Sequence, residues 1–66
     1  MTERDVQLRL TLIRAKARDP ESAHALEDDL AHMVLRAIAR EQCEDPRALA
    51  AAALQSREID FPRWVT

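Results

Sequence analysis

The stretch that decides the fold is residues 19–46, DPESAHALEDDLAHMVLRAIAREQCEDP, which begins and ends with an Asp-Pro pair. An aspartate side chain accepts hydrogen bonds from the first amides of a helix. Proline suits the first helical position, because its φ is fixed and it has no N–H to leave unpaired. Proline also disfavours a helical conformation in the residue before it, so it ends the preceding helix. The two pairs therefore divide this glycine-free chain of 66 residues into three predicted helices.

The central segment, residues 20–41, is predicted to be the longest helix. Its apolar side chains recur at helical spacing and form one continuous stripe. The stripe consists of Ala23, Leu26, Leu30, Met33, Val34, Ala37 and Ile38. Leu35 lies off this stripe, on the side that carries Ala31 and Ala39, and it predicts a second, thinner contact surface.

The first segment, residues 2–18, begins with Thr2 and Asp5 at the spacing of a capping box. Its apolar side chains lie on two nearly opposite sides: Val6, Leu10, Ile13 and Ala17 on one, and Leu8, Leu12 and Ala15 on the other. A strand is the alternative for residues 6–12, where apolar and polar residues alternate, but Ile13 breaks the alternation. We predict a helix with two apolar sides, which is either sandwiched within the fold or shared with another subunit.

The third segment, residues 46–56, is rich in alanine and is predicted to be a helix with Leu49, Ala53 and Leu54 facing inward. Both aromatic residues follow it, in the segment 58–66, where Pro62 prevents a regular helix. We predict an extended aromatic strap in which Ile59, Phe61 and Trp64 pack across the helices. The alternative is a linear motif offered to another protein, with Phe61, Arg63 and Trp64 as its anchors.

Size and composition limit the class of protein. Residues 1–66 are enough for one small domain, which buries only roughly 60% of its unfolded surface, so self-association as a homodimer is an expected source of stability. Cys43 is the only cysteine, which fits a reducing compartment. The chain shows neither a signal peptide nor a membrane-spanning stretch, and we expect a cytoplasmic protein.

The charges are unevenly distributed. Residues 1–18 carry a net charge of +3, residues 19–32 carry −5, and the whole chain carries −2. An acidic chain argues against sequence-independent nucleic-acid binding, which needs a basic face. A nucleic-acid-binding regulator of the helix-turn-helix type remains the alternative function, although the third segment offers only Arg47 and Arg57 around its alanines.

His24, Asp28 and His32 follow one another at four-residue spacing and share one helical face. The outer two are roughly 12 Å apart along the axis, so one metal ion cannot be held by all three. Surface pairing of histidine with carboxylate is the simpler interpretation. The acidic neighbours of Cys43 disfavour its thiolate, and no other nucleophile has a base at a fixed spacing. The sequence therefore predicts no metal, cofactor, small-molecule substrate or enzymatic activity.

Three segments carry a resemblance: residues 23–28 (AHALED), residues 34–39 (VLRAIA) and residues 59–64 (IDFPRW). From about Arg14 onward the chain resembles a group of small helical proteins of actinobacteria and their bacteriophages, a group with no assigned function. The resemblance implies a bacterial or phage setting, and it marks His24, Glu27, Asp28 and Trp64 as motif positions.

These observations predict an all-α, three-helix domain that binds another protein or itself. In a phage setting, such a protein would modulate a host factor. The candidate protein-binding residues are His24, Asp28, His32, Phe61, Arg63 and Trp64.

Overall fold

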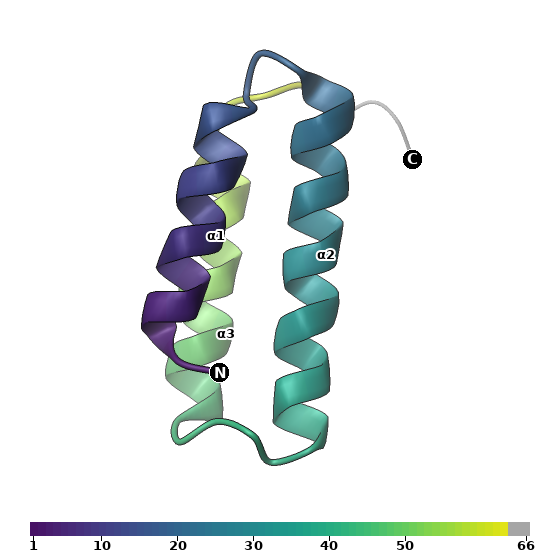
Figure 1. Ribbon diagram of the computed structural model, residues 1–66. Coiled ribbons are helices and arrows are strands. Elements are labelled where there is room, and N and C mark those ends of the chain that lie inside the picture. The colour runs from purple at the N-terminus through teal and green to yellow at the C-terminus, as the bar shows by residue number, and fades with distance from the viewer. Residues whose placement is uncertain (64–66) are drawn as a thin grey trace.

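The computed structural model describes residues 1–63, and these form three helices: α1 (Glu3–Ala15), α2 (Pro20–Ala39) and α3 (Pro46–Leu54). A single 3₁₀ turn, η1 (Gln55–Glu58), continues from α3. The helices run alternately up and down, and each contacts the other two (Figure 1). Residues 1–63 contain no strand, so the predicted all-α class is confirmed. Among the same residues, no helix has the length and apolar character needed to cross a membrane.

The Asp-Pro pairs start α2 and α3 as predicted. Asp19 accepts hydrogen bonds from the backbone N–H of Ser22 at 3.4 Å and from its hydroxyl at 2.8 Å. Asp45 accepts a hydrogen bond from the backbone N–H of Ala48 at 3.0 Å. In both helices the proline occupies one of the first positions. Each aspartate thus satisfies an amide that would otherwise lack a partner at the start of the helix.

The helices are shorter at their C-terminal ends than predicted. Helix α1 ends at Ala15 instead of residue 18, and α2 ends at Ala39 instead of residue 41. The residues before Asp19 leave the helical conformation so that its carboxylate can cap the start of α2, whereas α2 itself ends because Glu41 adopts a left-handed conformation. The last residues assigned to the third helix instead belong to η1.

Helix α2 ends in a Schellman motif that lacks the usual glycine. The N–H of Gln42 donates to the carbonyl of Ala37 at 2.8 Å, and the N–H of Glu41 donates to the carbonyl of Ile38 at 3.1 Å. This geometry requires a left-handed residue, and Glu41 adopts it with φ of 55°. A residue with a Cβ is strained there by roughly 1–2 kcal/mol.

The core lies where the three helices meet. Its buried side chains are Val6, Leu10, Ile13, Ala23, Leu30, Val34, Ala37, Leu49, Ala52, Ile59 and Phe61. Ile59 and Phe61 come from the predicted strap, whereas Trp64, its third side chain, lies outside the described residues. The inward placement predicted for Leu54 is wrong, since this side chain is 68% exposed. It follows the buried Ala52 by two residues, about 200° around the helix, and so faces the other side.

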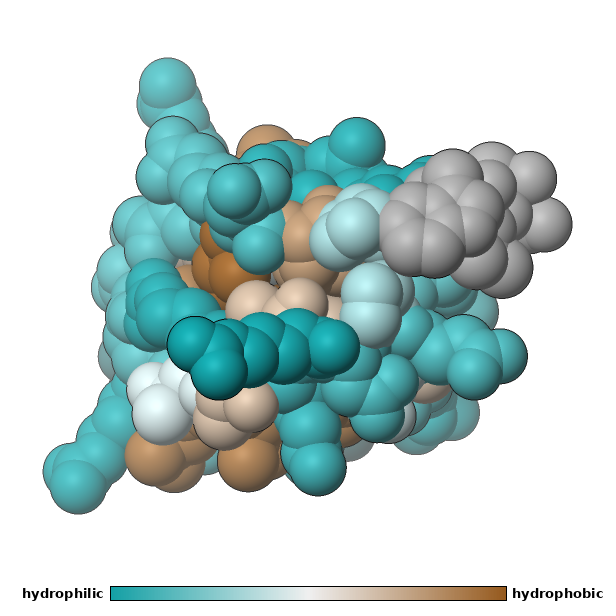
Figure 2. All heavy atoms as spheres, turned by 90° about the horizontal axis from the view of Figure 1, so that it is seen from above, coloured by the Kyte–Doolittle hydropathy of each residue, from teal (hydrophilic) through white to brown (hydrophobic). Residues whose placement is uncertain are grey.

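Apolar side chains are also found on the surface. Figure 2 looks onto the end of the bundle where α1 joins α2, and hydrophobic atoms are visible near its middle and along one edge, among mostly hydrophilic atoms. The exposed large apolar side chains are Leu8, Leu12, Leu35 and Leu54. The first two lie on the second apolar side predicted for α1.

Candidate functional site

A groove of about 350 Å³ runs between α2 and α3. Most of its walls are apolar, formed by Leu30, Ala31, Val34, Leu35 and Ile38 of α2 and by Ala50, Ala53 and Leu54 of α3. Polar groups close one end, where Glu27 and Asp28 of α2 meet Ser56 and Arg57 of η1. Such a concave apolar surface with polar groups at its end is typical of a binding site.

Two leucines stand on the walls of this groove. Leu35 on α2 is 63% exposed and Leu54 on α3 is 68% exposed. The alanines Ala31 and Ala50 lie one helical turn before them and leave space in the walls. The groove thus has two protruding leucines and, beside them, two apolar hollows left by the small alanines. Surfaces that bind an amphipathic helix have this kind of relief.

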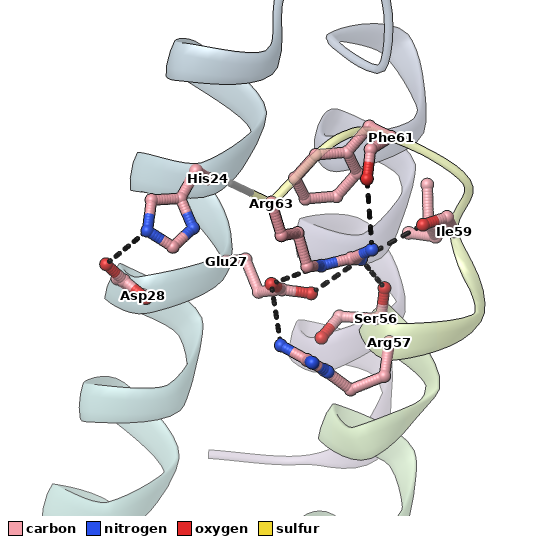
Figure 3. A network of polar contacts seen from close by, with 8 residues as sticks. All are labelled: His24, Glu27, Asp28, Ser56, Arg57, Ile59, Phe61 and Arg63. Carbon is pink, nitrogen blue, oxygen red and sulfur yellow. Dashed lines mark hydrogen bonds and ion pairs between the residues drawn. The ribbon is translucent and has the colours of Figure 1, made fainter. Parts of the chain in front are cut away.

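An ion pair anchors the polar end (Figure 3). Arg63 donates from Nε to Oε1 of Glu27 at 2.9 Å and from Nη2 to Oε2 at 3.1 Å. The same guanidinium donates to the carbonyls of Ser56, Ile59 and Phe61 at 2.8, 2.9 and 3.2 Å. Its carbon lies 3.8 Å from the centre of the Phe61 ring. Arg63 therefore ties the segment after η1 to the middle of α2.

The pKa of Glu27 is lowered despite its burial. Burial disfavours the charged carboxylate and is the largest single influence, but hydrogen bonds from Arg63 and Ser56 and the charges of Arg63 and Arg57 together outweigh it. Arg57 lies 3.7 Å from the carboxylate and its side chain is 66% exposed. Conversely, the hydrogen bond and charge of Glu27 raise the pKa of Arg63. Both partners are charged at neutral pH.

The predicted histidine–carboxylate face is present on α2. Nε2 of His24 lies 3.6 Å from Oδ2 of Asp28, while His32 is exposed. Nδ1 of His24 is buried and makes no hydrogen bond with any residue between 1 and 63. Of the described side chains, no three or more of His, Cys, Asp and Glu are grouped closely enough to hold a metal ion.

The structure brings the six residues predicted to bind protein together only in part: His24 contacts Asp28, and Arg63 contacts Phe61. Asp28 lines the groove, with His24 beside it, and His32 lies one turn further along α2. Phe61 is buried and the Arg63 side chain is only 18% exposed, because both face the core side of the fold. Trp64 lies outside the residues that the structure describes. The protein-binding role of these residues stays a prediction.

Two features of the site were not predicted from the sequence: the burial of Glu27, and the position of Leu35 and Leu54 on one groove. Glu27 follows Ala23 by four residues and precedes Leu30 by three, so the helical spacing that defined the apolar stripe also places this glutamate on it. A charged residue on a buried stripe indicates a buried partner of opposite charge. That signal was available, although it did not identify Arg63 as the partner.

A second groove, of about 460 Å³, lies between α1 and α2. Leu8 and Met33 line it together with four charged side chains, Asp5, Arg9, Arg36 and Arg40. Its walls are therefore less apolar than those of the α2–α3 groove.

Comparison of the chain with protein-family models, with curated proteins and with solved structures finds no match.

Proposed function

We propose that this chain is a non-enzymatic interaction module that binds a protein helix in the groove between α2 and α3. The observation that carries the proposal is the exposure of Leu35 and Leu54, at 63% and 68%, on the walls of one apolar groove. Fully burying a leucine contributes roughly 1.5–3 kcal/mol, and an amphipathic helix in a groove is a common way to use such a surface.

The polar end of the groove supports recognition of a defined orientation. The side chains of Asp28 and Arg57 are 61% and 66% exposed and carry opposite charges. Charged groups at the rim of an interface orient the partner and increase the association rate more than they increase affinity.

The C-terminal strap belongs to this proposal as a supporting element of the groove. Ile59 and Phe61 are buried, and Arg63 binds Glu27 at the polar end. A substitution of Trp64 distinguishes the two interpretations of the C-terminal segment, a strap or a recognition motif. Trp64→Ala should lower the melting temperature if Trp64 is part of the strap, whereas an unchanged melt with lost partner binding would indicate a motif.

Photo-crosslinking tests the binding surface directly. A photoreactive amino acid is placed at Leu35, on the groove, and in a matched variant at Leu12, an exposed leucine of α1. Irradiation in bacterial lysate, followed by mass spectrometry, should give protein adducts mainly from position 35. If the chain acts on a protein of a phage host, the adducts will include a host protein.

Two results would overturn the proposal. Equal or stronger adducts from Leu12 would move the binding surface to α1. An absence of protein adducts together with nucleic acid retained by the chain at moderate salt would favour the helix-turn-helix alternative.

A further inference from the structure

We infer that the occupant of the α2–α3 groove is a second copy of this chain, related by a two-fold axis that runs parallel to the two helices. This inference rests on the proposed function, because it specifies the partner of the same groove. Three features carry it: the levels of the leucines and alanines along the groove, the charges at its polar end, and the antiparallel course of the helices.

Side chains on the two walls of the groove lie in pairs at the same height along the helix axes. Nη1 of Arg57 in η1 lies 3.7 Å from Oε1 of Glu27 in α2, and α2 and α3 run in opposite directions from this contact (Figure 1). Helical residues advance by about 1.5 Å each and 3₁₀ residues by about 2.0 Å. Counting from this pair, Ala31 is therefore level with Leu54, and Leu35 is level with Ala50.

A two-fold axis parallel to the helices keeps these levels and places α2 of one copy against α3 of the other. Leu35 then faces Ala50 of the second copy, and Leu54 faces Ala31 of the second copy. Every protruding leucine meets a hollow left by an alanine, which is the knobs-into-holes arrangement of helical bundles. The four helices form an antiparallel bundle in which neighbouring helix dipoles oppose one another.

The charges select this axis over the other two-fold arrangement. With the axis parallel to the helices, Asp28 faces Arg57 of the second copy, because both residues lie at the level of Glu27. An axis perpendicular to the helices would instead set α3 against α3, and pairing Leu54 with Ala50 would then oppose Arg57 to Arg47. Two arginines facing each other at an interface disfavour association.

Sedimentation equilibrium on the full chain, from about 1 to 500 µM, tests the inference. We expect a monomer–dimer equilibrium that Leu35→Ser with Leu54→Ser weakens by at least roughly 100-fold, because four leucines lose their burial in the dimer. The matched control, Leu8→Ser with Leu12→Ser, removes two exposed leucines of α1 and should leave the dissociation constant within about twofold.

Charge substitutions test the orientation of the second copy. Asp28→Lys removes an attraction and adds a repulsion at the interface, so it should weaken the dimer by roughly tenfold. Asp29→Lys makes the same change at the next residue, which is exposed and does not line the groove, and should have little effect. Circular dichroism melts establish that each variant is folded before it is compared.

The outcomes separate this inference from the proposed function. A chain that stays monomeric at 500 µM overturns the second copy as occupant, and adducts to a different protein from Leu35 would then still support the groove as a binding site. A monomer without such adducts contradicts both. A dimer that responds to the α1 control, or equally to both aspartate substitutions, overturns the proposed interface.

Discussion

Arg63 and Glu27 are separated by 36 residues and joined by two hydrogen bonds, of 2.9 and 3.1 Å, between guanidinium and carboxylate. Bidentate pairing of this kind is among the stronger polar interactions in proteins. Here it fastens the end of the described chain to the centre of α2, at the polar end of the groove. The Glu27 side chain is only 8% exposed, so the charge of its carboxylate depends on the partners that surround it.

The ion pair should be costly to break from one side. Arg63→Met keeps the aliphatic stem and removes the guanidinium, which leaves the Glu27 carboxylate buried with only the exposed Arg57 nearby. We expect the free energy of unfolding, measured by urea titration, to fall by about 3 kcal/mol. Arg57→Met is the control, and it should cost less than about 1 kcal/mol because that side chain is mostly in solvent.

A second variant separates charge from packing. Adding Glu27→Leu to Arg63→Met removes the unpaired carboxylate, and we expect it to recover at least about 1 kcal/mol. If the double variant is no more stable than Arg63→Met, the loss came from packing of the arginine stem and not from an uncompensated charge.

Acid should weaken the fold through Glu27. Its pKa is lowered in the folded state from an ordinary value of 4.5. Above that value the carboxylate is ionised in both states and its stabilising effect is fully present. As the pH falls from there through the folded-state pKa, the unfolded chain binds the proton first and stability is lost.

Comparison with Glu27→Gln isolates this residue. The wild-type chain should be the more stable of the two at pH 7, and the difference should shrink below about pH 4.5. Asp5 and Asp19, whose pKa values are lowered by hydrogen bonds from Thr2 and Ser22, act in the same direction but are present in both proteins. Thermal melts between pH 7 and 3 measure the difference, and a constant gap would contradict the assignment.

The helices could be predicted because their signals are local. Asp19 and Asp45 cap the residues that follow them by three positions, and the spacing of apolar residues needs no knowledge of the rest of the chain. The predicted C-terminal ends of the helices are less accurate. Glu41 adopts the left-handed conformation that ends α2, although a glycine is the usual sequence signal for that conformation.

The site was harder to predict because it is tertiary. The burial of Glu27 depends on residues 56–63 folding back across α2, and no local pattern specifies that return. The periodicity places Leu35 off the core stripe, and the structure shows it exposed, whereas the inward placement predicted for Leu54 is wrong. The groove exists only because α2 and α3 pack so that Leu35 and Leu54 line the same surface, which the separate periodicities of the helices do not reveal.

The cap of α3 should matter more than its exposed position suggests. Asp45→Ala removes the acceptor of the Ala48 N–H, a bond of 3.0 Å, and should lower the free energy of unfolding by about 1 kcal/mol. Asp45→Asn keeps an acceptor and should retain most of the stability. The control is Glu44→Ala, which removes a neighbouring acidic residue that does not cap the helix. A loss of the same size from Glu44→Ala would show that charge, and not capping, is responsible.

Relief of the strained residue at the end of α2 should stabilise the protein. Glu41 has φ of 55°, and glycine adopts this conformation without a steric penalty, although it also gains freedom in the unfolded chain. The balance predicts that Glu41→Gly raises the free energy of unfolding by up to about 1 kcal/mol. Glu44→Gly, at an exposed position without positive φ, should instead be neutral or destabilising, because only the entropic cost applies there. Urea titration of both variants decides the point, and a destabilised Glu41→Gly would mean that the glutamate side chain contributes more than its backbone strain costs.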